Sequence, residues 1–184
     1  MSDKIIRKIA VIFVTDVVSF SKLMERDEDQ TLQSFRACKS ILDNLFEEHS
    51  GRIFNTAGDS VLAEFPSAVS AVICAAEFQK LVKERNASVE PLAEMHFRVG
   101  LNMGDVIVEG HNLYGDGVNV AARLEALSQP DGVCLSKSIH DFVSQKVDLA
   151  FKDLGDQKVK NTIVHAFDMT LEGMAVRELK QKAS

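Results

Sequence analysis

The sequence predicts an α/β fold, an α+β sandwich in which helices cover a mostly antiparallel sheet. Three observations lead to this prediction. The chain has 184 residues, of which 46% are hydrophobic, which is enough for one domain with a substantial core. Short apolar runs typical of strands alternate with longer segments whose apolar residues recur every three or four positions, as in helices. Gly-Asp pairs between the apolar runs indicate hairpins.

The first two elements are a strand and a long helix. The run "IAVIFVTD" at 9–16 is almost continuously apolar, which predicts a buried central strand that ends in a carboxylate. Between residues 32 and 46 the apolar residues are spaced by three and four, which predicts an amphipathic helix. We expect Gly51 to end this helix, since glycine is common just beyond a helix C-terminus.

A hairpin over 52–65 and a second amphipathic helix from Ser67 to Arg85 come next. Residues 86–94 carry a proline and are expected to form a surface connection. The apolar face of the second helix is predicted to contain Val69, Val72, Ile73 and Ala76.

The second half of the chain is expected to begin with a strand pair, 96–104 and 105–110, that turns at Gly104-Asp105. A loop then leads into a helix from about Val118 to Ser128, which a Pro-Gly segment ends. The remaining predicted elements are a strand at 133–136, a short helix at 138–145 and a last strand at 164–170. We therefore expect one domain over 1–170 and a charged, frayed tail over 171–184.

Composition limits the partners and the compartment. The formal net charge is -6 and the 21 Lys and Arg residues form no basic block, which argues against a general nucleic-acid surface. The three cysteines lie far apart in apolar segments, so we expect buried thiols in a reducing compartment. The apolar run at 9–14 is too short to cross a bilayer. These features predict a cytoplasmic domain with no membrane contact, unless the chain is part of a larger membrane protein.

Asp16 and Asp59 are candidate metal ligands. Asp16 ends the central strand, and Asp59 lies at the corner of the hairpin at 52–65. If the hairpin lies beside the strand, the two carboxylates converge at one rim of the sheet, where a divalent cation such as Mg²⁺ would relieve their repulsion. Taken alone, Asp59 is better explained as a turn residue, and Asp16 is equally well explained as a helix N-cap.

The segment "VVSFSK" at 17–22 follows Asp16 and starts a predicted helix. Amide N–H groups at a helix N-terminus bind phosphate oxygens. The backbone of Val18, Ser19, Phe20 and Ser21 is therefore a candidate phosphate-binding segment beside the metal site, and together they suggest a site for a metal-bound triphosphate.

Asn119 and Arg123 form the second constellation. They are four residues apart in the predicted helix and therefore share a face. An amide beside a guanidinium suits a site that orients a ribose and stabilises charge on phosphoryl oxygens. A solvated arginine with an incidental asparagine is the alternative explanation.

Four blocks, in this order, carry a resemblance to class III nucleotidyl cyclase catalytic domains: "VIFVTDVVSFSKL", "GRIFNTAGDSVLAEFPSA", "FRVGLNMGDVIVEG" and "LYGDGVNVAARLEAL". In addition, "DLGDQKVKN" resembles their C-terminal phosphate-binding segment. The match covers about 9–168. The series of blocks is specific, whereas any single block is weak.

This resemblance implies a ferredoxin-like class III cyclase fold and a head-to-tail homodimer with two composite active sites. It also implies that a purine nucleoside triphosphate, with ATP favoured, is converted to the 3′,5′-cyclic monophosphate and pyrophosphate. Each site would use two metal ions, Mg²⁺ or Mn²⁺. One ion would activate the ribose 3′-hydroxyl and the other would hold the triphosphate.

Carried over position by position, the family's metal ligands correspond to Asp16 and Asp59, with the carbonyl of Val17 as a third. The transition-state pair corresponds to Asn119 and Arg123, supplied by the other subunit. The triphosphate-binding lysine corresponds to Lys160.

The chain departs from the family pattern near the base and beside the metal site. Asn55 and Asn112 stand at the two base-reading positions and match neither the adenylyl nor the guanylyl cyclase pattern. An asparagine both donates and accepts hydrogen bonds, so it suits either purine edge. Ser19 stands where the family commonly has Gly, and Val14 where it has Phe.

Three functions remain open on the sequence alone. The first is an active purine nucleotide cyclase, adenylate or guanylate. The second is a non-catalytic nucleotide-binding and dimerisation module of the same fold, which the altered base-reading residues favour. The third is another phosphoryl-transfer enzyme of related fold, against which "VNVAAR" at 118–123 argues.

Overall fold

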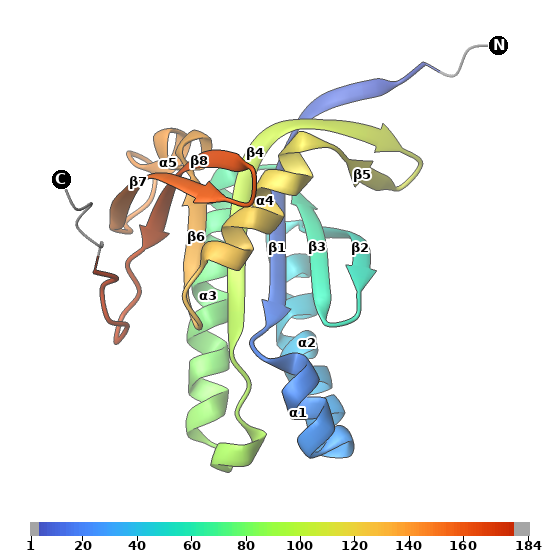
Figure 1. The fold of residues 1–184 in the computed structure, drawn as a ribbon, viewed down its shortest axis with the longest axis vertical. Helices are drawn as coiled ribbons and strands as arrows, with labels where there is room; N and C mark the ends of the chain where they lie inside the picture. Colours follow the sequence, from blue (N-terminus) through green and yellow to red (C-terminus); the bar gives the residue numbers. More distant parts are fainter. Residues whose placement is uncertain (1–3, 179–184) are drawn as a thin grey trace.

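An eight-stranded sheet forms the centre of the computed structural model, which describes residues 4–178 (Figure 1). The strand order is β2-β3-β1-β4-β6-β8-β7, and β5 pairs with β4 outside this path. Every pair is antiparallel except β4 with β6, so the predicted mostly antiparallel sheet is confirmed. The strands are β1 (Ile6–Val17), β2 (Arg52–Ala57), β3 (Ser60–Phe65), β4 (Phe97–Glu109), β5 (Asn112–Tyr114), β6 (Val133–Ser136), β7 (Phe151–Val159) and β8 (Thr162–Met169).

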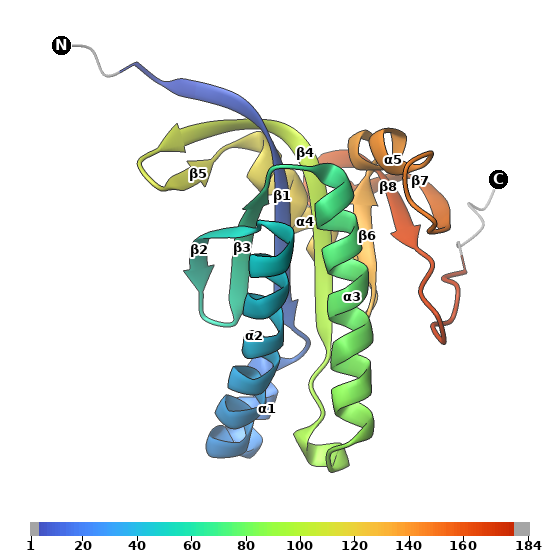
Figure 2. The ribbon, with the colours of Figure 1, turned by 180° about the vertical axis from the view of Figure 1, so that it is seen from behind.

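Helices cover both faces of the sheet. Figures 1 and 2 show α2 and α3 on one face and α4 alone on the other. The larger core lies between the sheet and the α2 and α3 layer, and a smaller core lies beneath α4. The helices are α1 (Phe20–Arg26), α2 (Glu28–His49), α3 (Ala68–Ala87), the 3-10 helix η1 (Pro91–Ala93), α4 (Asp116–Leu127) and α5 (Lys137–Val143).

The long ladder between β1 and β4 corrects one prediction. We expected a turn at Gly104-Asp105, but β4 continues through both residues, which pair with Ala10 and Ile9 of β1. The chain reverses later, at Gly110, between β4 and β5. A Gly-Asp pair is a hairpin signal only where no neighbouring strand pairs with it, and β1 is long enough to pair with all of β4.

Glycines allow α4 to lie close against β4. A Cβ at Gly100 would lie 2.2 Å from the backbone nitrogen of Glu125 and 2.4 Å from the carbonyl oxygen of Ala121, both in α4. A Cβ at Gly104 would lie 3.4 Å from the Cα of Gly117 in the first turn of the same helix. A Cβ at Gly117 would lie 2.7 Å from the carbonyl oxygen of Asp105, so Gly117 and Gly100 are the glycines that allow the close approach of helix to strand.

The two long helices occur where the spacing predicts them, with differences in detail. The residue in the left-handed conformation after α2 is Ser50, with φ 62°, and not Gly51. The N–H of Gly51 instead donates to the carbonyl of Phe46. In α3, Val72 is buried as expected, but the rest of the predicted face is only partly buried. Its buried residues are Ala68, Ala71, Val72, Cys74, Ala75, Phe78, Gln79, Val82 and Asn86.

The hairpin of β7 and β8 contains a strand that the sequence patterns missed. In residues 151–159 the apolar residues are isolated among charged and polar ones and form no apolar run, so only β8 was predicted. Beyond β8, the expected tail makes contacts as far as Arg177. This guanidinium pairs with Asp168 at 2.9 Å and donates to the carbonyl of Leu127, the last residue of α4. Residues 179–184 of the expected tail lie outside the described residues.

The prediction of buried thiols is confirmed. Cys38, Cys74 and Cys134 are all buried and form no disulfide. Burial raises the pKa of Cys74 and of Cys134 to about 12, and it also raises the pKa of Cys38. Within residues 4–178, no helix combines the length and the apolar character needed to cross a membrane.

Replacing Gly100 with alanine tests the close approach of α4. The added Cβ would meet backbone atoms of Ala121 and Glu125, which cannot move without displacing the helix. We expect Gly100→Ala to lower the free energy of unfolding by roughly 3 kcal/mol, measured by urea denaturation. Gly110→Ala is the control: its Cβ would meet nothing, and only its positive φ of 61° costs stability, about 1 kcal/mol. Equal losses in the two variants would contradict the packing argument.

Candidate active site

The end of β1 and the β2–β3 hairpin bring Asp16 and Asp59 together. β1 pairs with β3 from Val11 to Thr15, which places the hairpin turn beside the last residues of β1. There the carboxylate of Asp59 accepts a hydrogen bond from the backbone N–H of Val17, at 2.8 Å. Asp59 is therefore held against the residue that follows Asp16, as the convergence argument predicts.

Two further charged residues adjoin Asp16. Arg98 is its partner in the β1–β4 ladder, and the Arg98 Nε lies 4.0 Å from the Asp16 Oδ1. The same Nε lies 4.0 Å from the Oε1 of Glu125, which α4 directs toward the sheet. Burial, a hydrogen bond with the Asp16 side chain and the nearby charges of Asp16 and Asp59 raise the pKa of Glu125 well above its usual range. Two carboxyl groups, those of Asp16 and Glu125, thus flank a single guanidinium.

This donor set fits a hard divalent cation. Among the described residues, the buried Oδ1 of Asp16 has no hydrogen-bond partner, although a carboxylate oxygen normally has one. Carboxylate and carbonyl oxygens are the ligands that Mg²⁺ and Mn²⁺ prefer. Asp16, Asp59 and the carbonyl of Val17 are therefore suited to hold such ions.

The other predicted pair lies on the outer side of α4. Asn119 is exposed and Arg123 is half-buried, and both line an open hollow of about 170 Å³. Lys160 also lines this hollow, from the turn between β7 and β8, where it adopts a left-handed conformation with φ 55°. The structure thus brings Asn119, Arg123 and Lys160 together, whereas Asp16 and Asp59 are absent from the lining of the hollow.

The predicted phosphate-binding segment forms the turn into α1. Ser19 is the N-cap of α1 and has a left-handed backbone, φ 57° and ψ 37°, which favours glycine and explains the Gly common at this position in the cyclase pattern. The N–H of Val18 donates to the carbonyl of His96, so the Val18 amide is not free to bind phosphate. Phe20 packs its ring against Phe35. The amides of Ser19, Phe20 and Ser21 remain candidates, because first-turn N–H groups have no partner within a helix.

The two base-reading candidates lie on β2 and β5. The Oδ1 of Asn55 accepts a hydrogen bond from the N–H of Thr56, at 2.9 Å. The Oδ1 of Asn112 accepts one from the N–H of Leu113, and its Nδ2 donates to the hydroxyl of Tyr114. Both amides are thus held by their own strands in this structure.

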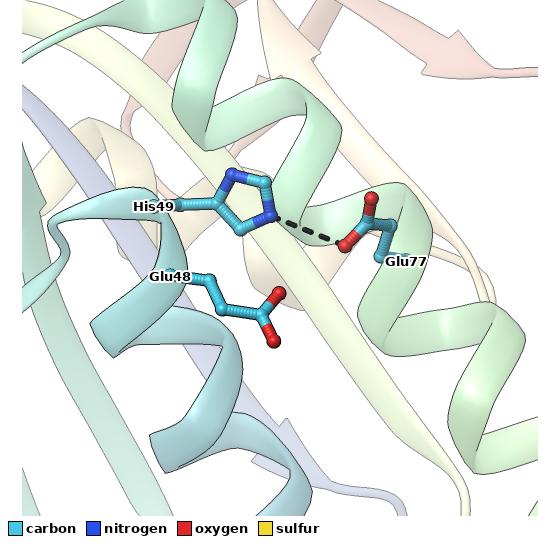
Figure 3. Close-up of side chains that lie close together, drawn as sticks. All are labelled: Glu48, His49 and Glu77. Carbon is cyan, nitrogen blue, oxygen red and sulfur yellow. Dashed lines mark hydrogen bonds and ion pairs between the residues drawn. The ribbon is translucent and has the colours of Figure 1, made fainter.

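Another group of ligand-type side chains lies on the opposite face of the sheet. Figure 3 shows Glu48 and His49 at the end of α2 beside Glu77 of α3. The His49 Nε2 lies 3.1 Å from a carboxylate oxygen of Glu77. This contact joins the two helices and does not belong to the site beneath α4.

Arg98 and Glu125 were missed by the sequence analysis, although each left a signal. Glu125 follows Ala121 by four positions and Val118 by seven, so it lies in the apolar stripe of α4, where a carboxylate is unusual. Arg98 lies near the start of a strand whose next residues are buried. Neither signal could be interpreted without the register that places both beside Asp16.

Comparison with solved structures places this arrangement in the class III cyclase fold. A structure described as an adenylate/guanylate cyclase/hydrolase from Silicibacter pomeroyi superposes with a TM-score of 0.84 and is 34% identical, covering 92% of this chain and all of that one. The adenylyl cyclase CyaB from P. aeruginosa, 21% identical with a TM-score of 0.78, covers 96% of this chain and has the same fold.

The chain belongs to the adenylate and guanylate cyclase catalytic domain family, whose model matches residues 1–173. A curated relative named putative adenylate cyclase 3, from Rhizobium meliloti, is 46% identical over 160 residues, which are 86% of this chain and 27% of the relative. An adenylate cyclase from Streptomyces coelicolor is 33% identical over 128 residues, 69% of this chain and 32% of the relative. The chain thus spans about a third or less of the length of these two relatives. It is placed among the cyclases, which are lyases.

Proposed function

We propose that this domain converts a purine nucleoside triphosphate, with ATP favoured, to the 3′,5′-cyclic monophosphate and pyrophosphate at two composite sites of a head-to-tail homodimer. One observation carries the proposal. The chain presents paired carboxylates at the end of β1 and an asparagine, an arginine and a lysine around a hollow on the outer side of α4. We call the carboxylates the carboxylate half of the site and the three side chains around the hollow the other half. Cyclisation of a triphosphate requires both.

The geometry of α4 supports a shared site. Glu125 and Arg123 are two residues apart, so their side chains project about 200° apart around the helix. Glu125 points to the sheet and to Asp16, and Arg123 therefore points away from both. Asp16 and Arg123 of one chain cannot act on the same phosphate without a large movement of α4. A second copy that brings its Arg123 to Asp16 would complete each site.

In the carboxylate half, Asp16, Asp59 and the carbonyl of Val17 would hold the two Mg²⁺ or Mn²⁺ ions. When bound, these ions lower the pKa of the ribose 3′-hydroxyl and neutralise charge on the triphosphate. Ser19, Phe20 and Ser21 would donate backbone N–H groups to phosphate oxygens at the start of α1.

In the other half, the side chains of α4 and the β7–β8 turn would contact the substrate. The 3′-oxygen forms a bond to the α-phosphorus as the bond from that phosphorus to the pyrophosphate oxygen breaks, and the 3′-hydroxyl proton leaves to solvent. Arg123 would donate hydrogen bonds to the phosphoryl oxygens as their charge grows. Asn119 would orient the ribose, and Lys160 would pair with the leaving pyrophosphate.

The preference for ATP rests on the two relatives named adenylate cyclases, since the base-reading candidates are neutral. Asn55 and Asn112 each have an Oδ1 that accepts a hydrogen bond from a neighbouring backbone N–H.

Incubation of the purified protein with ATP or GTP and Mn²⁺, followed by mass analysis of the products, tests the function directly. Cyclic AMP and pyrophosphate are the expected products. Bound but unchanged nucleotide would indicate the non-catalytic module instead.

Removing the charge of Asp59 tests the metal half. Asp59→Asn keeps an oxygen that can accept from the N–H of Val17, so the fold should persist, but it removes one anionic ligand. We expect roughly a 100-fold or greater loss of kcat at saturating Mn²⁺, with an unchanged melting temperature. Asp43→Asn, on the exposed side of α2, is the matched control and should retain activity. Near wild-type turnover in Asp59→Asn would refute the two-carboxylate assignment, and loss of folding would favour a structural turn.

Mixing two inactive variants tests the shared sites. Asp16→Ala removes the carboxylate half and Arg123→Ala removes the other, so each homodimer should be inactive. A mixed dimer would contain one intact site, and we expect up to half the wild-type activity per dimer. The measurement is cyclase activity after subunit exchange, with heterodimer formation verified by two affinity tags. A verified mixed dimer without activity would count against composite sites.

Changing the two asparagines tests base recognition. Because a neutral amide discriminates by only about 1 kcal/mol, the parent should prefer ATP over GTP by only a few-fold in kcat/KM. Asn55→Lys together with Asn112→Asp should increase that ratio toward ATP. A strongly selective parent, or an unchanged ratio in the double variant, would show that these positions do not recognise the base.

A further inference from the structure

A series of charged side chains joins the turn between β4 and β5 to the β2–β3 hairpin. Arg52 is the first residue of β2, and its guanidinium makes two hydrogen bonds. Its Nη1 donates to the carbonyl of His111 in the turn, at 2.7 Å, and its Nη2 donates to the Oε1 of Glu64 in β3, at 2.9 Å. The other carboxylate oxygen of Glu64 lies 2.6 Å from the Nζ of Lys8 in β1. Arg52 thus ties the turn to the body of the sheet.

Glu64 is a firm anchor for this guanidinium. It is the cross-strand partner of Arg52 in the β2–β3 ladder, and its side chain is only 17% exposed. Partial burial raises the pKa of Glu64, but the hydrogen bonds from Lys8 and Arg52 outweigh this effect and lower the pKa below its usual value. Glu64 is therefore charged at neutral pH and holds one side of the guanidinium, which leaves the other side directed at the carbonyl of His111.

The turn and β2 carry the two base-reading candidates. Asn112 directly follows His111, and Asn55 lies three residues beyond Arg52, about 10 Å along the strand. The side-chain hydrogen bonds of Asn112 stay within β5 and therefore do not fix β5 relative to β2. The separation of the two asparagines depends instead on the contacts between the turn and β2.

Apolar packing between β2 and β5 supports the same arrangement. A bulge between Ile53 and Asn55 leaves Phe54 without a partner in the β3 ladder. Phe54 and Leu113 are both buried in the smaller core beneath α4. Such packing is non-directional, so it keeps the two strands together without fixing their relative positions along the sheet. The hydrogen bond from Arg52 has a required length and direction and supplies that constraint.

We infer that Arg52 is a positioning residue that holds the β4–β5 turn against β2 and so sets the separation of Asn55 and Asn112 for recognition of one purine base. This inference rests on the proposed function for the roles of the two asparagines. A purely structural role predicts a loss of stability when Arg52 is replaced, although exposed charge pairs contribute little to stability. The positioning role predicts a looser turn and weaker nucleotide binding at an unchanged melting temperature.

Amide hydrogen exchange tests the hold on the turn and needs neither nucleotide nor turnover. Arg52→Met keeps the apolar stem of the side chain and removes both hydrogen bonds. We expect exchange in residues 110–114 to become about fivefold faster, with an unchanged melting temperature. Arg7→Met is the matched control, because Arg7 forms an exposed ion pair between two strands, with Asp105, rather than a bond to the turn. Unchanged exchange in Arg52→Met would overturn the inference.

Binding of 3′-deoxy-ATP with Mg²⁺, measured by titration calorimetry, tests the effect on the base site. This nucleotide lacks the attacking hydroxyl, so binding is measured without cyclisation. We expect Arg52→Met and Asn112→Ala each to raise the Kd about fivefold. The double variant should bind no more weakly than either single variant, because Asn112 contributes only while Arg52 holds it in place. Lys160→Ala is the control partner: it lies in a separate turn, so its loss should multiply with that of Arg52→Met.

The outcomes separate this inference from the proposed function. An unchanged Kd in Arg52→Met would overturn the inference. Losses that multiply between Arg52→Met and Asn112→Ala would also overturn it, since they would indicate that Arg52 acts on the nucleotide independently of Asn112. A protein that binds no 3′-deoxy-ATP would refute the proposed function, and the exchange measurement would still decide whether Arg52 holds the turn.

Discussion

The antiparallel ladder between β1 and β4 is the constraint on which the rest of the structure depends. Its register runs without a break from Ile6 opposite Val108 to Val17 opposite Phe97. Because side chains alternate between the two faces of a strand, this register places Asp16 on the α4 face with Arg98 beside it. A slip of one residue would move Asp16 to the face covered by α2 and α3 and would bury it in the larger core. The site therefore depends on an ordinary property of sheets, maintained over the whole length of two strands.

The second constraint is that α4 lies very close to the sheet and carries polar residues on two opposite sides of the helix. Its inner side meets β4 at Gly100 and carries Glu125, while its outer side carries Asn119 and Arg123. Under the proposed function, one helix supports the carboxylate half of a site and presents the groups of the other half. Under the proposed function, those outer groups act on the substrate of the partner's site. Any force that shifts α4 would then affect both sites of a dimer, because the same short helix belongs to each.

Much of the fold and part of the site could be predicted from sequence, for identifiable reasons. The convergence of Asp16 and Asp59 was predictable because a strand end and an adjacent hairpin corner must meet if the two strands pair, and the hydrogen bond to Val17 confirms their proximity. The turn at Gly104-Asp105 was wrong because both residues pair with β1, and local patterns do not distinguish a turn from a strand that continues along its neighbour. Strand β7 was missed because its outward side chains are charged and its inward ones are few.

Arg98 and Glu125 show why the remainder of the site could not be found in this way. Each is a charged residue in a mostly apolar element, which from sequence alone is equally consistent with an exposed edge or a buried pair. What distinguishes these alternatives is the distance between two residues 27 positions apart in sequence, and that distance is set by Gly100 and by the β1–β4 register rather than by either residue. The geometry of such a site depends on backbone contacts, and no pattern of side chains in the sequence reveals those contacts. A carboxylate found on the apolar stripe of a helix is therefore best interpreted together with the glycine on the strand that the helix covers.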